Sequence, residues 1–511
     1  MKSSKFIWFP VIIILMLSTV ILFSWIDPPS SKYSIDLSKT NQPAVISGFL
    51  KLGTHIDPSG NVLDVNNLYF IRNGKPWFPV MGEFHFSRYP REQWEESILK
   101  MKAGGIDIIA TYVFWIYHEE QEGVFDWSGD RDLRYFISLC AKHGMEVWVR
   151  VGPWCHGEVR NGGFPDWLLQ KAKVRTNDST YLHYVKLYFS EINKQLKGYY
   201  FKEGGTVIGT QIENEFRFNN AKGLAHMLIL KKMAVNAGID VPYYTATGWP
   251  GSDLKQNELL PVWGAYPEAS WDNKTTQLPL SPNYLFGSLR NDPAIGADLL
   301  GKQDEQTAAN TGFPYPFATA ELGSGNQVTY HRRPIIEADD VTALAYVKAG
   351  SGANLLGYYM YHGGSDKIGK LSTLQESQAT GYPNDCPLIS YDFYSPISEW
   401  GQLRPSYRKY KSLHLFLNDF GDILAPLYLV FPEHETSLPT TTDTLRWSVR
   451  AKDNSGFIFI NNFQRQLKMH DIKDVRLDLK LKTGIVLHVP EMAVNIPKDA
   501  QLIWPFNLTL S

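Results

Sequence analysis

Hydrophobic positions follow two alternating rhythms between about residues 75 and 385. Short runs rich in β-branched residues, such as those in 106–113 and 206–212, are typical of buried parallel strands. Between them, apolar residues recur three and four positions apart, the spacing of one helix face. Strands that alternate with helices in this way form a parallel sheet, so the fold class is α/β. The eight predicted strands begin near Val80 and continue over residues 106–113, 147–151, 206–216, 243–245, 261–266, 316–321 and 354–360.

The predicted helices have recognisable ends. Pro90 opens the first of them, and Gly104 and Gly105 end it. The other helices are expected over residues 130–143, 180–196 and 221–237. The turn after the first strand lacks the glycine-rich pattern of a dinucleotide-binding sheet, which favours a closed barrel. The sequence therefore predicts a (β/α)8 TIM barrel, with the catalytic domain assigned to residues 66–414.

The regions on either side of the barrel have a different pattern. Residues 27–65 are polar and are interpreted as a linker, followed by a hairpin that turns at Asn73 and Gly74. Residues 415–511 contain short alternating runs without a long helical stripe, which predicts an all-β C-terminal domain. At about 100 residues, this C-terminal domain is expected to be short or truncated.

The N-terminus combines charge with a long apolar segment. Lys2 and Lys5 precede an apolar run from Phe6 to Ile26, which predicts a signal peptide or a signal anchor over residues 1–26. The bulky residues near Trp25 do not form a small-residue cleavage site, so both interpretations stay open, including anchoring in a membrane. In either case the protein is expected to be exported, as a periplasmic, secreted or envelope-anchored protein.

Composition excludes several classes of function. The 511 residues carry a net charge of −2, which gives no electrostatic basis for binding nucleic acid. Aromatic residues make up 14% of the chain, and a cluster of them would suit the apolar faces of sugar rings. The three cysteines form no CxxC pair and suggest neither a disulfide scaffold nor a zinc site. We therefore expect no metal or organic cofactor. The oligomeric state is not specified by the sequence.

Carboxylates follow two of the predicted strands. Glu213, Asn214 and Glu215 end the fourth strand, and Glu321 ends the seventh. Side chains alternate along a strand, so Glu213 and Glu215 are expected on one face. In a barrel these strand ends converge on the mouth, where catalytic groups lie. Two carboxylates there, without a histidine cluster for a metal, match glycoside hydrolysis. The alternative is a pair of unrelated acids in salt bridges.

Several motifs together resemble glycoside hydrolase family 35, the retaining β-galactosidases, whose clan carries Asn-Glu on strand four. No single motif would be specific, but their combination along the barrel is. The matching segments are Gly82–Arg88, Thr111–Trp115 with His118 and Glu119, Gly152–Glu158, Gly162–Leu168 and Gln211–Glu215.

The resemblance implies a function and a set of site residues. It implies an exo-acting β-galactosidase that removes terminal non-reducing β-D-galactose from oligo- or polysaccharides by double displacement. Glu215 would be the general acid/base and Glu321 the nucleophile. The residues that would hold sugar hydroxyls are Tyr112, Glu158, Asn214 and Tyr359.

Two segments depart from the family pattern. His156-Gly157-Glu158-Val159 stands where Cys-Ala-Glu-Trp is common, and Ala320-Glu321-Leu322 replaces a Thr-Glu-aromatic context. Because these residues surround the expected sugar pocket, a related exo-β-glycosidase of different sugar specificity stays open. A non-catalytic glycan-binding protein on the same scaffold is the second alternative.

Overall fold

The structure is a computed structural model that describes residues 32–39, 43–216, 221–246, 257–297, 315–432 and 438–509. The predicted signal peptide or anchor at residues 1–26 lies outside these ranges. Within them, no helix combines the length and the apolar character needed to cross a membrane.

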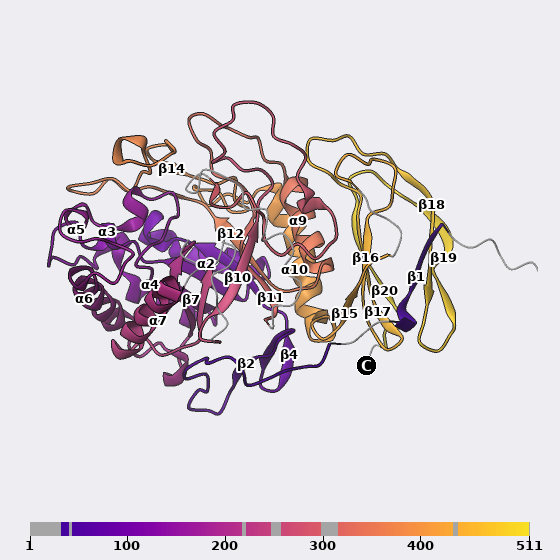
Figure 1. The fold of residues 1–511 in the computed structure, drawn as a ribbon, viewed down its shortest axis with the longest axis horizontal. Helices are drawn as coiled ribbons and strands as arrows, with labels where there is room; N and C mark the ends of the chain where they lie inside the picture. Colours follow the sequence, from indigo (N-terminus) through magenta and orange to yellow (C-terminus); the bar gives the residue numbers. More distant parts are fainter. Residues whose placement is uncertain are drawn as a thin grey trace, which may run out of the picture.

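Eight parallel strands close into a barrel, which confirms the predicted (β/α)8 fold class (Figure 1). The last strand pairs with the first, Leu356 lying opposite Val80. The strands are β5 (Val80–Phe84), β6 (Ile108–Tyr112), β7 (Glu146–Arg150), β8 (Val207–Asn214), β9 (Tyr243–Ala246), β10 (Leu260–Ala265), β11 (Phe317–Gly323) and β12 (Ala353–His362).

The four predicted helices are present on the outside of the barrel as α2 (Trp94–Ala103), α4 (Leu133–Lys142), α6 (Ser179–Leu196) and α7 (Ala221–Asn236). Two of them begin with an aspartate whose side chain accepts a backbone N–H of the first turn, Asp132 from Tyr135 and Asp178 from Tyr181. Among the described residues, α9 (Ala338–Gly350) and α10 (Pro405–Leu424) are two further long helices that were not predicted.

A small sheet precedes the barrel. It consists of β2 (Leu63–Val65), β3 (Phe70–Arg72) and β4 (Lys75–Trp77), each antiparallel to the next. The turn between β3 and β4 has φ of 50° at Asn73 and 76° at Gly74. Both residues adopt the left-handed conformation that a two-residue hairpin turn requires, so this predicted hairpin is confirmed.

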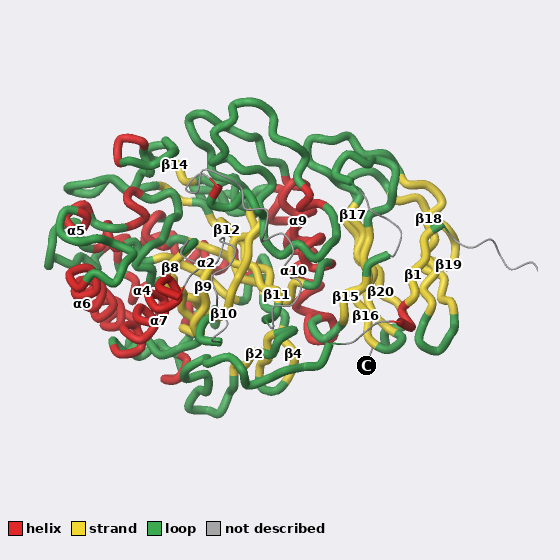
Figure 2. Tube along the Cα trace, viewed as in Figure 1, coloured by secondary structure: helices red, strands yellow, loops and turns green. Residues whose placement is uncertain are grey.

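The C-terminal part of the chain forms two packed sheets, shown as yellow strands at one end of the molecule in Figure 2. The buried side chains of both sheets, Val449 and Leu477 among them, share one hydrophobic core. One sheet contains β15 (Tyr428–Val430), β16 (Trp447–Lys452), β17 (Ser455–Asn461) and β20 (Gln501–Phe506), and the other contains β18 (Ile472–Lys480), β19 (Val486–Ile496) and β1 (Tyr33–Asp36).

Two predicted boundaries are wrong. Residues 27–65 are not simply a linker, because β1 pairs in parallel with β18, Tyr33 opposite Leu477 (Figure 1). The alternation of buried Tyr33 and Ile35 with more exposed neighbours marks this strand, although four residues are a weak signal. The predicted change of domain at residue 415 falls inside α10, and the β-rich part begins only at Tyr428.

Strands β16 and β17 of the C-terminal part are buried on both faces, which fixes this part against the barrel. Ile458 faces the core between the two sheets, whereas Phe459 belongs to the barrel core. On the barrel side, the buried Arg450 donates hydrogen bonds to the carbonyl oxygens of Ala349 and Leu424, at 3.1 and 3.0 Å. Loops of the C-terminal sheets are therefore held in a fixed position relative to the barrel.

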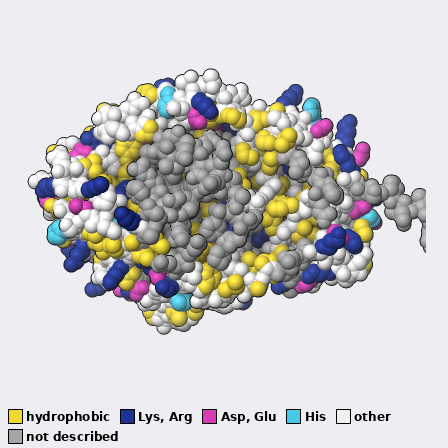
Figure 3. All heavy atoms as spheres, in the orientation of Figure 1, with side chains coloured by type: hydrophobic (Ala, Val, Ile, Leu, Met, Phe, Trp, Pro, Cys, Tyr) yellow, Lys and Arg dark blue, Asp and Glu magenta, His cyan; other side chains and the backbone are white. Residues whose placement is uncertain are grey.

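The surface is mixed in charge. On the face drawn in Figure 3, Lys and Arg side chains alternate with Asp and Glu around the rim. This agrees with the net charge of −2 and shows no single-sign field among the described residues of that face.

Candidate active site

The barrel brings Glu215 and Glu321 to one cavity at its mouth. Glu215 directly follows β8 and Glu321 lies in β11, the fourth and seventh barrel strands. Their side chains are 9% and 7% exposed, so both carboxyl groups are withdrawn from bulk water. The cavity is also lined by all four residues predicted to hold a sugar: Tyr112, Glu158, Asn214 and Tyr359.

The cavity between these residues is small. Its volume is about 30 Å³, whereas ligand pockets usually measure roughly 300–1,000 Å³. Side chains at its mouth must therefore move when a sugar ring enters.

Glu213 and Glu215 were expected on one face of their strand. This expectation was wrong, because Glu213 does not line the cavity that Glu215 lines. Both residues have left-handed backbone conformations, with φ of 57° at Glu213 and 45° at Glu215. The regular alternation of a strand is lost there. Glu213 is instead fully buried against Arg175, with 2.8 Å between Nη2 and Oε2. The same guanidinium donates to the backbone oxygens of Asn214 and Glu215, at 2.9 and 3.2 Å. Glu213 thus positions the strand end.

Arg150, the last residue of β7, connects the functional strand ends. It is fully buried and lies 2.7 Å from a Glu83 oxygen and 3.2 Å from a Glu321 oxygen. Its guanidinium also donates to the Asn214 side-chain oxygen at 2.9 Å, which leaves the Asn214 amide nitrogen to face other partners. Arg150 therefore supplies the positive charge beside Glu321 and orients Asn214. Sequence reasoning missed it, because a single arginine at a strand end carries no local signature.

The carboxyls of Glu215 and Glu321 influence each other's ionisation. Burial, together with the charge of Glu215, raises the pKa of Glu321 to about 7, although Arg150 acts in the opposite direction. Burial also opposes ionisation of Glu215, but His156, with Arg175 and Arg150, brings its pKa below the ordinary value. Of the two carboxyls, Glu321 is the one whose surroundings favour the protonated form.

His156 is a basic side chain beside Glu215. Its Nδ1 lies 3.3 Å from a Glu215 oxygen, and both side chains are almost completely buried. His156, Gly157 and Glu158 all have left-handed backbone conformations, with φ of 58°, 57° and 44°. This unusual turn aims His156 and Glu158 at the cavity, and such backbone strain is typical of functional sites. From the sequence, His156 was noted as a departure from the family pattern and interpreted as a hydroxyl-binding or structural residue, without a link to Glu215.

A buried chain of polar groups supports Glu83 from behind. Arg88 pairs with Asp366 at 2.8 Å and lies 3.0 Å from His85 Nδ1. Because arginine only donates, this His85 nitrogen accepts and the other one, 3.1 Å from Glu83, carries the proton. Burial lowers the pKa of His85 to about 4, in keeping with a neutral ring. The chain continues from Glu83 through Arg150 to Glu321.

A second group of hydrogen bonds holds Glu158 and Tyr359. The Tyr359 and Tyr391 hydroxyls are 2.7 Å apart, and Tyr391 donates to a Glu158 oxygen. Tyr391 comes from β14 (Ser390–Tyr391), a two-residue strand that sequence periodicity does not detect. The Tyr112 hydroxyl is buried and has no hydrogen-bond partner within the part of the chain that the structure describes. A buried unpaired hydroxyl in the wall of a cavity is a ready contact for a ligand.

Comparisons with known proteins agree with this geometry. The model of the family described as "Glycosyl hydrolases family 35" matches residues 69–417. A protein from Mus musculus named beta-galactosidase is 28% identical over 352 residues, which cover 68% of this chain and 48% of that protein. For the beta-galactosidase of Homo sapiens the identity is 34% over 350 residues, 68% of this chain and 46% of the human protein. A beta-galactosidase from Xanthomonas manihotis is 36% identical over 194 residues, 38% of this chain and 32% of that protein. The chain spans about half the length of these relatives or less.

Proposed function

The chain belongs to glycosyl hydrolase family 35, and we propose from its site that it is an exo-acting, retaining β-galactosidase. The observation that supports this best is the cavity in which Glu215 and Glu321 meet Tyr112, Glu158, Asn214 and Tyr359. Relatives named beta-galactosidase support the choice of sugar. The substrate would be an oligo- or polysaccharide with β-D-galactose at its non-reducing end.

The first chemical step would transfer galactose to the protein. Protonated Glu215 gives its proton to the glycosidic oxygen, which leaves as an alcohol. The Glu321 carboxylate attacks the anomeric carbon as that bond breaks and forms a glycosyl ester. Arg150, 3.2 Å from Glu321, stabilises the ionised form of this nucleophile.

This step needs Glu215 protonated and Glu321 ionised, the reverse of what their pKa shifts favour, so substrate binding would have to favour the proton on Glu215. The number of protons in the pair does not change. A glycosidic oxygen that accepts a hydrogen bond from Glu215 favours the protonated form of that carboxyl, because hydrogen bonding to the neutral form raises its pKa. The pair then titrates as one unit, with apparent pKa values that belong to both groups.

The second step would release galactose with its original configuration. Glu215, now ionised, takes a proton from water, and the water oxygen attacks the anomeric carbon while the bond to Glu321 breaks. Asn214 would hold the 2-hydroxyl of the sugar through its amide, whose oxygen is fixed by Arg150 at 2.9 Å. Such contacts to the 2-hydroxyl strengthen in the transition state.

The test is hydrolysis of a chromogenic β-galactoside by the wild-type protein and by Glu215→Gln and Glu321→Gln. We expect turnover by the wild type and its loss in both variants. A panel of other aryl glycosides distinguishes the related exo-β-glycosidase, which would prefer a sugar other than galactose. Binding of galactosides without turnover would instead identify a glycan-binding protein and refute the proposal.

We further propose that the protein acts after export, directed by the apolar segment Phe6–Ile26. The test is the location of the full-length protein after fractionation, compared with a variant that carries three added lysines within this segment. Retention of both proteins in the cytoplasm would contradict this proposal.

A further inference from the structure

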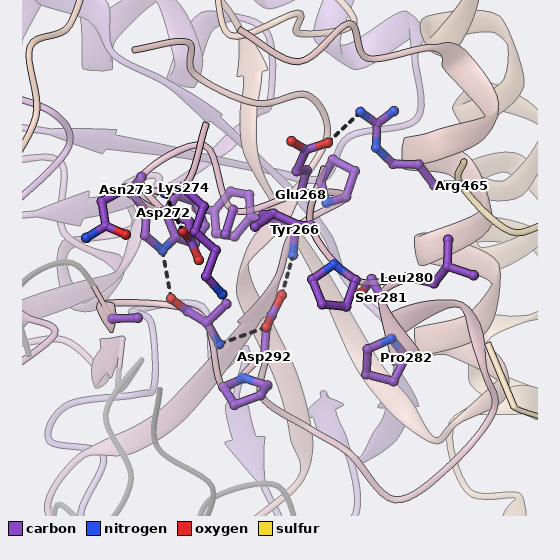
Figure 4. A pocket seen from close by; sticks show the side chains of 18 of the residues that line it. Tyr266, Glu268, Asp272, Asn273, Lys274, Leu280, Ser281, Pro282, Asp292 and Arg465 are labelled. Atoms are coloured by element: carbon purple, nitrogen blue, oxygen red, sulfur yellow. Dashed lines mark hydrogen bonds and ion pairs between the residues drawn. The ribbon is translucent and has the colours of Figure 1, made fainter. Parts of the chain in front are cut away.

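A second, larger pocket opens beside the catalytic cavity. Its volume is about 500 Å³, within the range of roughly 300–1,000 Å³ that ligand pockets usually have. Loops after β10 form most of its wall, and Arg465 and Gln466 from the C-terminal sheets complete it (Figure 4). The two spaces share Tyr266, Trp271 and Asn384 as lining residues, so a chain emerging from the first space enters the second.

Trp271 is held rigidly where the two spaces adjoin. Its indole nitrogen donates to the Ala294 carbonyl at 2.7 Å. The Tyr266 ring packs edge-on against it, with 5.0 Å between ring centroids. The indole is therefore fixed before any ligand arrives, and its part-exposed surface offers an apolar platform. Such a platform suits the apolar face of a sugar ring.

The charged groups that line this pocket are of both signs, and the buried carboxylates among them have partners. Glu268 is paired with Arg332 and with Arg465, at 2.7 and 2.8 Å, and Figure 4 shows Arg465 directed toward it. Asp292 accepts a hydrogen bond from the Asn283 amide at 2.7 Å. Asp272 and Lys274 add one charge of each sign, so the lining has no strong excess of either sign to attract an ionic ligand.

The remaining wall combines stiff apolar surfaces with amides. Pro279 and Pro293 contribute apolar surface with little freedom to lose, while Asn273 and Gln466 supply amide groups at the rim. A neutral sugar chain presents the same combination of apolar faces and hydroxyls.

From this geometry, and resting on the proposed function, we propose that the second pocket binds the leaving portion of the substrate, a neutral oligosaccharide with at least two sugar rings beyond the cleaved bond. Trp271 would hold the ring nearest the cleavage point. The loop that carries Gln466 would contact a ring further out, so the C-terminal sheets would take part in substrate selection.

The test compares kcat/KM for an aryl β-galactoside with kcat/KM for neutral galactosides that carry one, two and three sugar rings beyond the cleaved bond. In the wild type, kcat/KM should increase up to at least the second ring. Trp271→Ala should lower the ratio of the long to the aryl substrate by roughly tenfold, as about 60 Å² of apolar sugar surface would stay in water. Gln466→Asn, which suits the left-handed backbone there (φ 64°), should lower the ratio severalfold.

Trp400→Ala is the matched control, since this tryptophan is 71% exposed and lines neither space. Its ratio should equal that of the wild type. Equal ratios in all four proteins, with efficient hydrolysis of the aryl galactoside, would overturn the pocket assignment and leave the proposed function standing. Failure of the wild type to hydrolyse any galactoside would overturn both.

Discussion

Replacing His156 should move the pH dependence of hydrolysis to higher pH. His156 lies 3.3 Å from Glu215, and the positive charge of its protonated ring lowers the pKa of both Glu215 and Glu321. Its removal therefore raises both apparent pKa values of the carboxyl pair, whichever carboxyl carries the shared proton. Asparagine is the best replacement because it is neutral and tolerates the left-handed backbone at this position.

The size of the effect follows from the short distance. Two unit charges 3.3 Å apart attract each other by ~5 kcal/mol at an effective dielectric constant of about 20. At 1.36 kcal/mol per pH unit this sets an upper bound of about 3.7 pH units. The imidazolium charge is spread over its ring, and Arg175 and Arg150 still face Glu215. We therefore expect both limbs of the pH profile to be displaced toward higher pH by at least about one unit.

The assay is kcat/KM of His156→Asn on an aryl β-galactoside between pH 4 and 9, which reports the pKa values of the free enzyme. His183→Asn is the matched control, because this histidine is exposed on α6, away from the cavity, and its profile should equal that of the wild type. An unchanged profile in His156→Asn, or a movement of its limbs to lower pH, would refute the electrostatic role given to His156.

Three further outcomes follow from the structure. Arg450→Met should lower the free energy of unfolding by about 3 kcal/mol, because it leaves buried carbonyl oxygens without donors. The control Lys473→Met, at an exposed position, should leave the free energy of unfolding unchanged. Equal urea midpoints for the two variants would contradict this. The free energy of unfolding should decrease as the pH is lowered below 6.5, because burial lowers the pKa of His118 and His362 to about 3. As the pH falls, both histidines become protonated in the unfolded chain before they do in the folded protein, so each lowers the free energy of unfolding by about 1.4 kcal/mol per pH unit. Urea midpoints that stay constant from pH 7.5 to 5.5 would contradict this prediction. Glu215→Gly should still form the glycosyl ester from a substrate with a good leaving group and be partly rescued by azide; equal losses on good and poor leaving groups would contradict its acid role.

Much of the barrel could be predicted because long, strongly periodic segments encode it. The run Val207–Ile212 and the helical stripe around Phe136 are strong local signals, and the structure has both elements there. The strand β1 was missed because its four residues gain their structure from pairing with β18, more than 400 positions away. Short strands that depend on such distant partners leave little local trace.

The predicted site residues line one cavity because the carboxyl ends of parallel strands all lie at the same end of the barrel. Their directions were harder to predict. Alternation placed Glu213 beside Glu215, but the left-handed backbone at both residues sends Glu213 to Arg175 instead. The supporting charges were also missed, since Arg150 and His156 acquire their roles only from neighbours on other strands.

The most direct test of the account is to trap the glycosyl ester with a 2-deoxy-2-fluoro-β-galactoside that carries a good leaving group. Digestion and mass spectrometry then identify the labelled peptide. We predict one labelled peptide, the one that contains Glu321, and no label in Glu321→Gln. A label on Glu215, Glu158 or Glu213 would contradict the assigned roles, and turnover of an ordinary galactoside without any trapped ester would contradict the retaining mechanism.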